Sequence, residues 1–164
     1  NLYEGGVRSP LIVWGPAFIE EHKRGLTNDE NYFCAMDLVP SLISIAEIRL
    51  EPGHGFDGED LSATLLGLQR RSRNEPIYWR RPPDRPGTKV EDYPDLAMRD
   101  EKWKLLMEYD GSAAQLYDLV ADPGEQDNLA DQQPQLVQHL RAMLLTWNRS
   151  MPSDRGPELE ADRK

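Results

Sequence analysis

The sequence has 164 residues and a formal net charge of -10, with 38% hydrophobic and 29% charged residues. A chain of this length can bury a core, its apolar segments argue against disorder, and its acidic balance disfavours a nucleic acid partner, because phosphate backbones bind basic surfaces. The single cysteine excludes an intramolecular disulfide, and the absence of an apolar run of membrane-spanning length predicts no membrane partner.

The chain opens with a glycine pair that leads into an apolar run. Residues 3–8 read Tyr-Glu-Gly-Gly-Val-Arg, and residues 11–14 read Leu-Ile-Val-Trp. Paired glycines let the backbone turn tightly, Pro10 stiffens the exit, and the aliphatic run is typical of a buried strand. We therefore predict a tight loop that feeds a core strand over residues 11–14.

Two helices are predicted in the next part of the chain. Asp37 has the side chain of an N-cap, and apolar residues at helical spacing predict a largely buried helix that ends near Ala46. Residues 51–60 are rich in Pro, Gly and acidic residues, which predicts a turn. Leucines from Leu61 onward then predict a short second helix that ends near Gly67. We place the end of this first portion, residues 1–70, at the polar and basic stretch that follows.

The remainder has the pattern of a small antiparallel sheet and one long helix. Strands are predicted at residues 76–80, 96–99, 103–109 and 115–119, with a long Pro-rich loop at residues 81–94. From about position 133 to position 149, apolar residues form one wide helical stripe, which should cover one face of the sheet. We expect this subdomain to occupy residues 71–150 and residues 151–164 to form a mobile tail.

Several of these stretches resemble, in order, the C-terminal part of the type I sulfatases, the arylsulfatase-like enzymes of the alkaline phosphatase superfamily. The resemblance rests on Tyr-Glu-Gly-Gly-Val-Arg with its strand ending Trp-Gly-Pro, on Asp-Leu-Val-Pro-Ser-Leu-Ile-Ser-Ile-Ala, and on the series Met-Arg-Asp-Glu-Lys-Trp-Lys-Leu, Leu-Tyr-Asp-Leu, Asp-Pro, Glu and Asn-Leu-Ala. It extends from about Tyr3 to Trp147. It implies an α/β remnant of the catalytic domain followed by an α+β subdomain, in which about four antiparallel strands pack against a C-terminal helix.

The resemblance also implies what the parent enzyme does. Such a sulfatase hydrolyses the sulfate ester of a small molecule or glycan. It uses a formylglycine made from a cysteine in a Cys-x-Pro-x-Arg context, a calcium ion, and Lys and His residues that polarise the sulfate. Cys34 lacks that context, so we interpret it as a structural thiol, and the family's catalytic lysine comes shortly before Tyr3. We therefore predict that this chain contains no catalytic residue, metal or cofactor and is inactive alone.

Six residues are candidates for the rim or the support of the substrate pocket: Glu4, Arg8, His54, Trp79, Arg80 and Arg81. Glu4 lies in the loop that the resemblance places beside the sulfate pocket, where it could brace the loop and orient the missing lysine, or cap its own backbone. Arg8 could contact the substrate, although a tie to a carboxylate is the more common role. His54 lies in a glycine-flanked loop that could reach the pocket.

An aromatic ring and two guanidinium groups come together at Trp79, Arg80 and Arg81. Guanidinium pairs suit the planar, bidentate recognition of sulfate, and the Pro-rich loop that follows is long enough to form a pocket rim. Adjacent strand residues face opposite sides, however, so both arginines can face one ligand only if the strand has already ended.

The sequence leaves two alternatives open. A phosphonate or phosphate monoester hydrolase of the same superfamily would share these C-terminal features, with a threonine or serine nucleophile in its N-terminal part as one distinguishing sign. A free-standing oligomerisation or interaction module is the other, because residues 11–14 would form an edge strand in need of a partner. That strand would then form a homodimer or join the C-terminal sheet. The location is unknown, and a periplasmic or secreted parent is compatible with the family.

Overall fold

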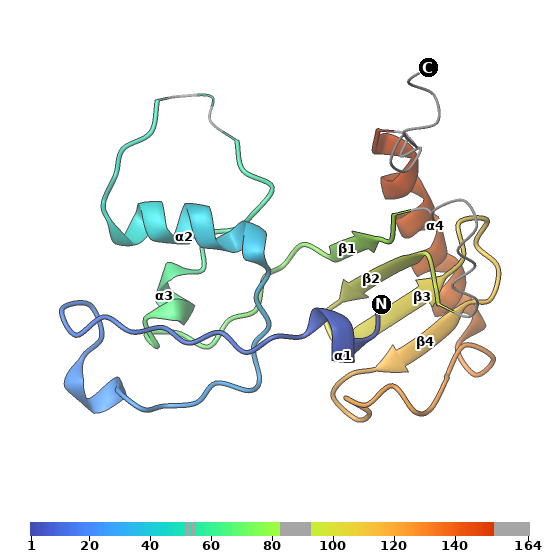
Figure 1. The fold of residues 1–164 in the computed structure, drawn as a ribbon, viewed down its shortest axis with the longest axis horizontal. Coiled ribbons are helices and arrows are strands. Elements are labelled where there is room, and N and C mark those ends of the chain that lie inside the picture. Colours follow the sequence, from blue (N-terminus) through green and yellow to red (C-terminus); the bar gives the residue numbers. More distant parts are fainter. Residues whose placement is uncertain (52, 54, 83–92, 153–164) are drawn as a thin grey trace, which may run out of the picture. The chain divides into compact units, whose positions relative to one another are not determined.

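The computed structural model describes residues 1–51, 53, 55–82 and 93–152, and the chain divides into two compact units (Figure 1). One unit combines Asn1–Ser9 with Pro76–Lys164, and the other is Pro10–Glu75. We call them the sheet unit and the helical unit. The N-terminal segment, which we grouped with the rest of residues 1–70, belongs here to the sheet unit because its side chains pack on the sheet.

The sheet unit is built on a four-stranded antiparallel sheet. Its strands are β1 (Ile77–Arg80), β2 (Leu96–Asp100), β3 (Trp103–Met107) and β4 (Gln115–Asp118), and they pair in the order of the sequence. Asp100 lies opposite Trp103, and the chain turns between them through Glu101, whose φ is 50°. The predicted antiparallel sheet of about four strands is confirmed.

One face of this sheet is covered by the predicted C-terminal helix, α4 (Pro134–Ser150) (Figure 1). Pro134 lies in the first turn, where its missing N–H leaves no intrahelical bond unmade. The shared core consists of Leu96, Met98, Leu105, Met107 and Leu116 from the strands and Val137, Leu140 and Leu144 from α4. The rings of Tyr78 and Trp147 stack beside this core, with centroids 5.1 Å apart.

The opposite face of the sheet is covered by the first residues of the chain. Leu2 belongs to a second buried cluster, together with Ala97, Leu106, Tyr117 and Leu119. The short helix α1 (Glu4–Val7) follows and contains the glycine pair. A Cβ on Gly6 would collide with the backbone carbonyl of Asn1, so the tight turn requires glycine here. This turn places Glu4, which is buried, over the sheet.

The described part of the helical unit is built from short helices: η1 (Glu21–Lys23), η2 (Ala35–Asp37), α2 (Leu38–Ile45) and α3 (Ser62–Leu65). A polar centre holds them, because the fully buried carboxylate of Asp37 accepts hydrogen bonds from the backbone of Cys34 at 2.9 Å and of Glu59 at 2.8 Å. The guanidinium of Arg73 pairs with the same carboxylate at 3.0 Å. Asp37 precedes α2 as predicted, but its side chain caps no α2 backbone group, because these partners engage both of its oxygens.

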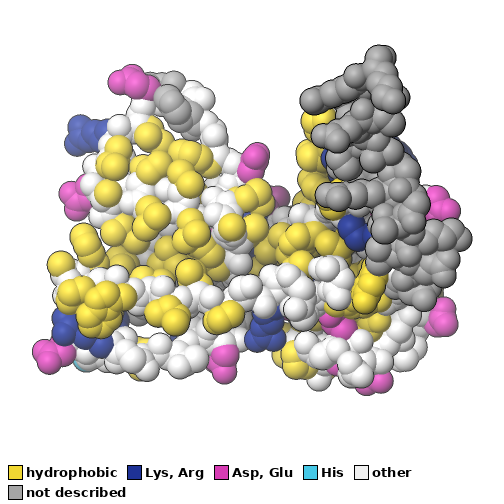
Figure 2. All heavy atoms as spheres, in the orientation of Figure 1, with side chains coloured by type: hydrophobic (Ala, Val, Ile, Leu, Met, Phe, Trp, Pro, Cys, Tyr) yellow, Lys and Arg dark blue, Asp and Glu magenta, His cyan; other side chains and the backbone are white. Residues whose placement is uncertain are grey.

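Two expectations for the helical unit are wrong. Residues 11–14 form no strand, because no described segment pairs with them, and Ile12 is 88% exposed; nor do they join the C-terminal sheet, whose strands are β1 to β4. Helix α2 is not largely buried, since Leu42 is 56% exposed. Figure 2 shows the hydrophobic side chains gathered over the elements of this unit. The apolar side chains of the helical unit therefore bury little of one another's surface.

Some expectations concern residues outside the described ranges. His54, the central part of the Pro-rich loop (residues 83–92) and residues 153–164 of the predicted tail lie there. Within the described ranges, no helix combines the length and apolar character that crossing a membrane requires.

Candidate functional site

A buried ion cluster fastens the Glu-Gly-Gly segment to the sheet. The ammonium of Lys104, on β3, lies 2.8 Å from Oε1 of Glu4 and 2.9 Å from Oε1 of Glu125. The Lys104 side chain is fully buried, and the Glu4 and Glu125 side chains are 9% and 4% exposed. Charges removed from water this completely need partners, and here one ammonium donates a hydrogen bond to Glu4 and forms an ion pair with Glu125.

The local sequence explains how these three side chains meet. Leu105 faces α4, so alternation along β3 turns Lys104 to the opposite face, where the N-terminal segment lies. Glu125 follows β4 in a turn-rich loop, where it has a φ of 54°. Its carboxylate reaches back to the cluster and accepts a hydrogen bond from the backbone N–H of Glu4 at 2.6 Å. Glu4 is therefore held through both its side chain and its backbone.

Two further side chains surround the cluster. A terminal guanidinium nitrogen of Arg99 lies 3.9 Å from Oε2 of Glu4, so two cations face the two carboxylates. The ammonium of Lys104 also lies 5.8 Å from the ring centroid of Trp79, within the range of a cation–π contact. These contacts distribute the charge of the cluster without leaving an unpaired ion in it.

A pair of tyrosines anchors the start of the same segment. The hydroxyls of Tyr3 and Tyr117 both donate to Oε1 of Gln115, at 2.7 Å and 2.8 Å. Burial, with help from the neighbouring Tyr3 and Glu125, raises the pKa of Tyr117 to about 12. The Tyr117 phenol therefore acts as a hydrogen-bond donor at neutral pH, which fits a structural anchor.

The other predicted candidates do not gather into one site. Arg8 is exposed and makes no side-chain bond to the described residues, and its tie to a carboxylate stays a prediction. The guanidinium of Arg80 donates to the carbonyl of Pro152 at 3.0 Å and 3.1 Å, whereas that of Arg81 pairs with Asp95 at 2.7 Å. Strand β1 ends at Arg80, so Arg81 lies beyond it, and the two guanidiniums have different partners here.

Of the six candidates, Glu4 and Trp79 are brought together, and they meet at Lys104. Lys104 and Glu125 were missed by the sequence reasoning. The available signal for Lys104 was its place next to Leu105, Leu106 and Met107, where apolar residues at successive positions indicate that both faces of the strand are buried. Glu125 gave no comparable signal, because an acidic residue in a turn is ordinarily solvated.

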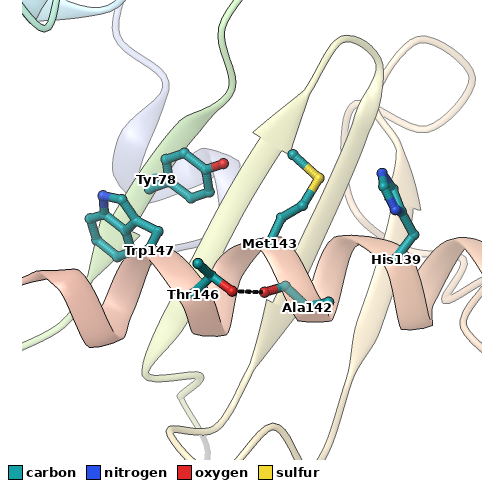
Figure 3. Close-up of a pocket in the computed structure, with 6 residues that line it drawn as sticks. All are labelled: Tyr78, His139, Ala142, Met143, Thr146 and Trp147. Atoms are coloured by element: carbon teal, nitrogen blue, oxygen red, sulfur yellow. Dashed lines mark hydrogen bonds between the residues drawn. The ribbon is translucent and has the colours of Figure 1, made fainter.

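An open hollow of about 500 Å³ lies along α4 beside β1. It is lined by Tyr78, His139, Ala142, Met143, Thr146 and Trp147 (Figure 3). The Thr146 hydroxyl donates to the Ala142 carbonyl within the helix at 2.8 Å, as Figure 3 shows. The lining contains no lysine or arginine for a sulfate group, and none of the predicted candidates lies in it.

Neither calcium nor formylglycine fits the residues that the structure describes. Within the described ranges, no three His, Cys, Asp or Glu side chains gather as a metal site requires. The formylglycine motif needs proline two residues and arginine four residues after its cysteine, but Met36 and Leu38 stand at those distances from Cys34. The half-buried Cys34 instead contributes its backbone N–H to the polar centre of the helical unit.

Residues 1–150 match the family model described as N-sulphoglucosamine sulphohydrolase, C-terminal. The chain is 31% identical to human arylsulfatase A over 175 residues, covering 88% of this chain and 31% of that protein. It is 32% identical to the choline-sulfatase of Rhizobium meliloti over 133 residues, covering 80% of this chain and 23% of that protein. The chain thus spans less than a third of the length of either relative.

Solved structures agree with the sequence comparison. A structure from work on the metabolism of multiple glycosaminoglycans by Bacteroides thetaiotaomicron has a TM-score of 0.51 at 25% identity, covering 69% of this chain and 24% of that chain. Ps i-CgsB in complex with k-i-k-neocarrahexaose has a TM-score of 0.57 at 21% identity, covering 77% of this chain and 26% of that chain. The second comparison shows a likeness of fold alone.

Proposed function

Since this chain belongs to the sulfatase family, as a C-terminal region of the N-sulphoglucosamine sulphohydrolase type, we propose that it completes an enzyme that hydrolyses sulfate esters. In that reaction, water and the ester give the alcohol and inorganic sulfate. The family match over residues 1–150 is the observation that carries the proposal. The substrate is a sulfated small molecule or glycan, a class that spans relatives as different as the Rhizobium meliloti choline-sulfatase and the N-acetylgalactosamine-6-O-sulfatase of Bacteroides thetaiotaomicron.

The contribution of the chain to the pocket would be to present the Glu-Gly-Gly segment. The cluster at Lys104 supports this role, because it fixes Glu4 and thereby the turn that follows. Arg8 is exposed four residues further on, which suits a side chain that faces a substrate. Trp79 and Arg80, at the end of β1, and Arg81, directly after it, remain candidates for the pocket rim.

The chain alone is proposed to be inactive. Cys34 lacks the Pro and Arg of the formylglycine motif, and within the described ranges no three His, Cys, Asp or Glu side chains gather to hold a metal ion. The helical unit also lacks cover for its apolar side chains, since Ile12, Trp14 and Phe18 are 88%, 76% and 60% exposed. We propose that these residues pack against the rest of a sulfatase α/β domain, because burying them would be favourable by about 25 cal/mol per Å².

The test compares two substrates in two forms of the protein. The full-length protein that contains this chain and residues 1–164 alone are each assayed with an aryl sulfate and with the matching aryl phosphate. We expect sulfate release by the full-length protein and none by residues 1–164. Preferential release of phosphate would instead support the phosphate or phosphonate monoester hydrolase, and turnover by residues 1–164 would refute the inactivity.

The second candidate function is an interaction module, favoured by the exposed run at residues 11–14. Here the run would pair with its copy in a homodimer. Light scattering on residues 1–164 measures the mass directly. A dimer that Ile12→Asp converts to a monomer would support the module, whereas a monomer at all concentrations would count against it.

A further inference from the structure

We infer that Lys104 and Glu125 are positioning residues of the proposed sulfatase, which set the Glu-Gly-Gly segment in place from 100 and 121 residues further along the chain. This inference rests on the proposed function and deepens it. Neither residue would touch the substrate. Each would act through Glu4, and so through the segment that the sulfatase resemblance places beside the sulfate.

The contacts of Glu4 explain how the cluster can control the segment. Its side chain is held by Lys104 and its backbone N–H by Glu125. The Glu4 carbonyl in turn accepts a hydrogen bond from the backbone N–H of Arg8 at 2.9 Å. Gly6 and Val7 donate to the carbonyl of Tyr3 at 2.7 Å and 3.1 Å. One turn therefore connects the cluster to Arg8, and fixing Glu4 sets the direction in which the chain leaves the sheet.

The charges make this arrangement specific for a lysine at position 104. Without the Lys104 ammonium, the buried carboxylates of Glu4 and Glu125 would lie next to each other. The remaining cation, Arg99, lies 3.9 Å from Oε2 of Glu4. The carboxylates would then repel each other, and the segment would leave the sheet to hydrate Glu4. An apolar side chain at position 104 could fill the space but could not hold the segment.

The sheet itself does not depend on this cluster for its main core. Its larger cluster of buried side chains lies on the face that α4 covers, away from Lys104. Loss of the ammonium should therefore release the segment while β2 and β3 stay paired. This separation distinguishes a positioning role from a general contribution to folding.

The backbone of Glu125 supports the same assignment. A φ of 54° is the left-handed region that non-glycine residues seldom occupy, and Gly124 stands directly before it. The carboxylate that this conformation delivers is nevertheless the group that holds Glu4. A glutamate thus stands at a place where glycine would be less strained.

The first experiment measures amide hydrogen exchange in the full-length protein that contains this chain. Lys104→Met is compared with Lys102→Met, a control lysine in the turn directly before β3, whose side chain is 46% exposed and pairs with Asp118. We expect the amides of Gly6, Val7 and Arg8 to exchange about tenfold faster or more in Lys104→Met, while the amides of β2 and β3 keep their protection. Unchanged protection of residues 6–8 would overturn the inference.

The second experiment measures aryl sulfate hydrolysis by the same variants. A displaced loop should lower kcat/KM by about 100-fold in Lys104→Met, mainly through kcat, with Lys102→Met close to the wild type. The double variant Lys104→Met/Glu125→Gln should recover part of the loss, because it removes one of the two repelling carboxylates. A Lys104→Met enzyme with unchanged kcat, or a double variant that is worse than the single one, would overturn the positioning role.

Two further outcomes are separable. If Lys104→Met also loses the protection of β2 and β3, Glu125→Gln is used instead. Its amide oxygen can still accept from the Glu4 backbone, but the charge that pairs with Lys104 is lost. About tenfold lower kcat with an intact sheet is then expected. An intact sheet with unchanged kcat would refute the role. A wild-type protein that cleaves no sulfate ester would refute the proposed function, and the exchange data would show separately whether Lys104 holds the segment.

Discussion

The sheet unit buries its large apolar side chains on both faces of one sheet, whereas the helical unit leaves many of its own in water. Leu105 and Leu106, neighbours on β3, are both fully buried in opposite clusters. In the helical unit, Ile12 is 88% exposed, and the fully buried residues of its centre include Asp37 and Ser41. The sheet unit thus has a hydrophobic core of its own, while the helical unit is held by a polar centre and depends on further cover for its apolar residues.

The largest expected effect tests the polar centre. Replacing Asp37 by alanine leaves the Arg73 guanidinium buried without its partner, which typically costs about 3–5 kcal/mol. We expect the helical unit to lose its amide protection while β2 and β3 keep theirs. The control is Glu30→Gln, which removes an exposed pair with Arg70 and should change stability by less than about 1 kcal/mol. An unchanged helical unit in Asp37→Ala would break the comparison.

The next effect tests where the hydrophobic core lies. Leu105→Ala should lower the free energy of unfolding by about 2–5 kcal/mol, because it leaves a cavity in the cluster under α4. Ile12→Ala, at an 88% exposed position, should stay within about 0.5 kcal/mol in residues 1–164. Urea titration measures both. A large loss in Ile12→Ala would mean that residues 11–14 are already covered, for example by a second copy.

A smaller effect concerns close backbone approach in the helical unit. A Cβ at Gly58 would collide with the backbone carbonyl of Met36, so Gly58→Ala should cost about 1–3 kcal/mol. At Gly5 a Cβ would meet no atom within 4 Å, and Gly5→Ala should change stability by no more than about 0.5 kcal/mol. Equal melting temperatures for the two variants would contradict this account.

The smallest effect at neutral pH concerns Tyr117 in the sheet unit. Burial raises its pKa from the ordinary value of 10.0 to about 12, so the unfolded chain ionises first as the pH rises. The stabilisation that comes from the raised pKa of Tyr117 is complete below pH 10.0. It should be lost as the pH rises from 10.0 to about 12. Tyr117→Phe should reduce that alkaline loss. Urea titrations across this range measure it, and an identical slope in both proteins would argue against the raised pKa.

The regular elements of the sheet unit could be predicted because their signals are local. Alternation marks the strands, and the apolar stripe from Leu136 to Trp147 marks α4. The same local reasoning failed at residues 11–14, because a β-like composition does not reveal whether a neighbouring strand exists to pair with it. Helix α2 was placed correctly, but its burial was not, since that depends on what lies against it.

The candidate site was less predictable for a related reason. Glu4 could be singled out from its motif, but its partner Lys104 is 100 residues away and resembles the exposed Lys102 in type. Lys102 lies in the turn directly before β3 and is 46% exposed, whereas Lys104 lies within the strand and is fully buried. The contact of Glu4 to Glu125 depends on a left-handed backbone conformation, which a turn-rich sequence allows at several positions.

The long separation between Glu4 and its partners also has a consequence for synthesis. The strands of the sheet pair with their neighbours in sequence, so each hairpin can form soon after its second strand has emerged. Glu4 must wait for Glu125, 121 residues later, which takes on the order of ten seconds at usual translation rates. During that interval its carboxylate stays hydrated, and the segment can dock only on a sheet that already exists. These early residues are thus among the last to reach their final place.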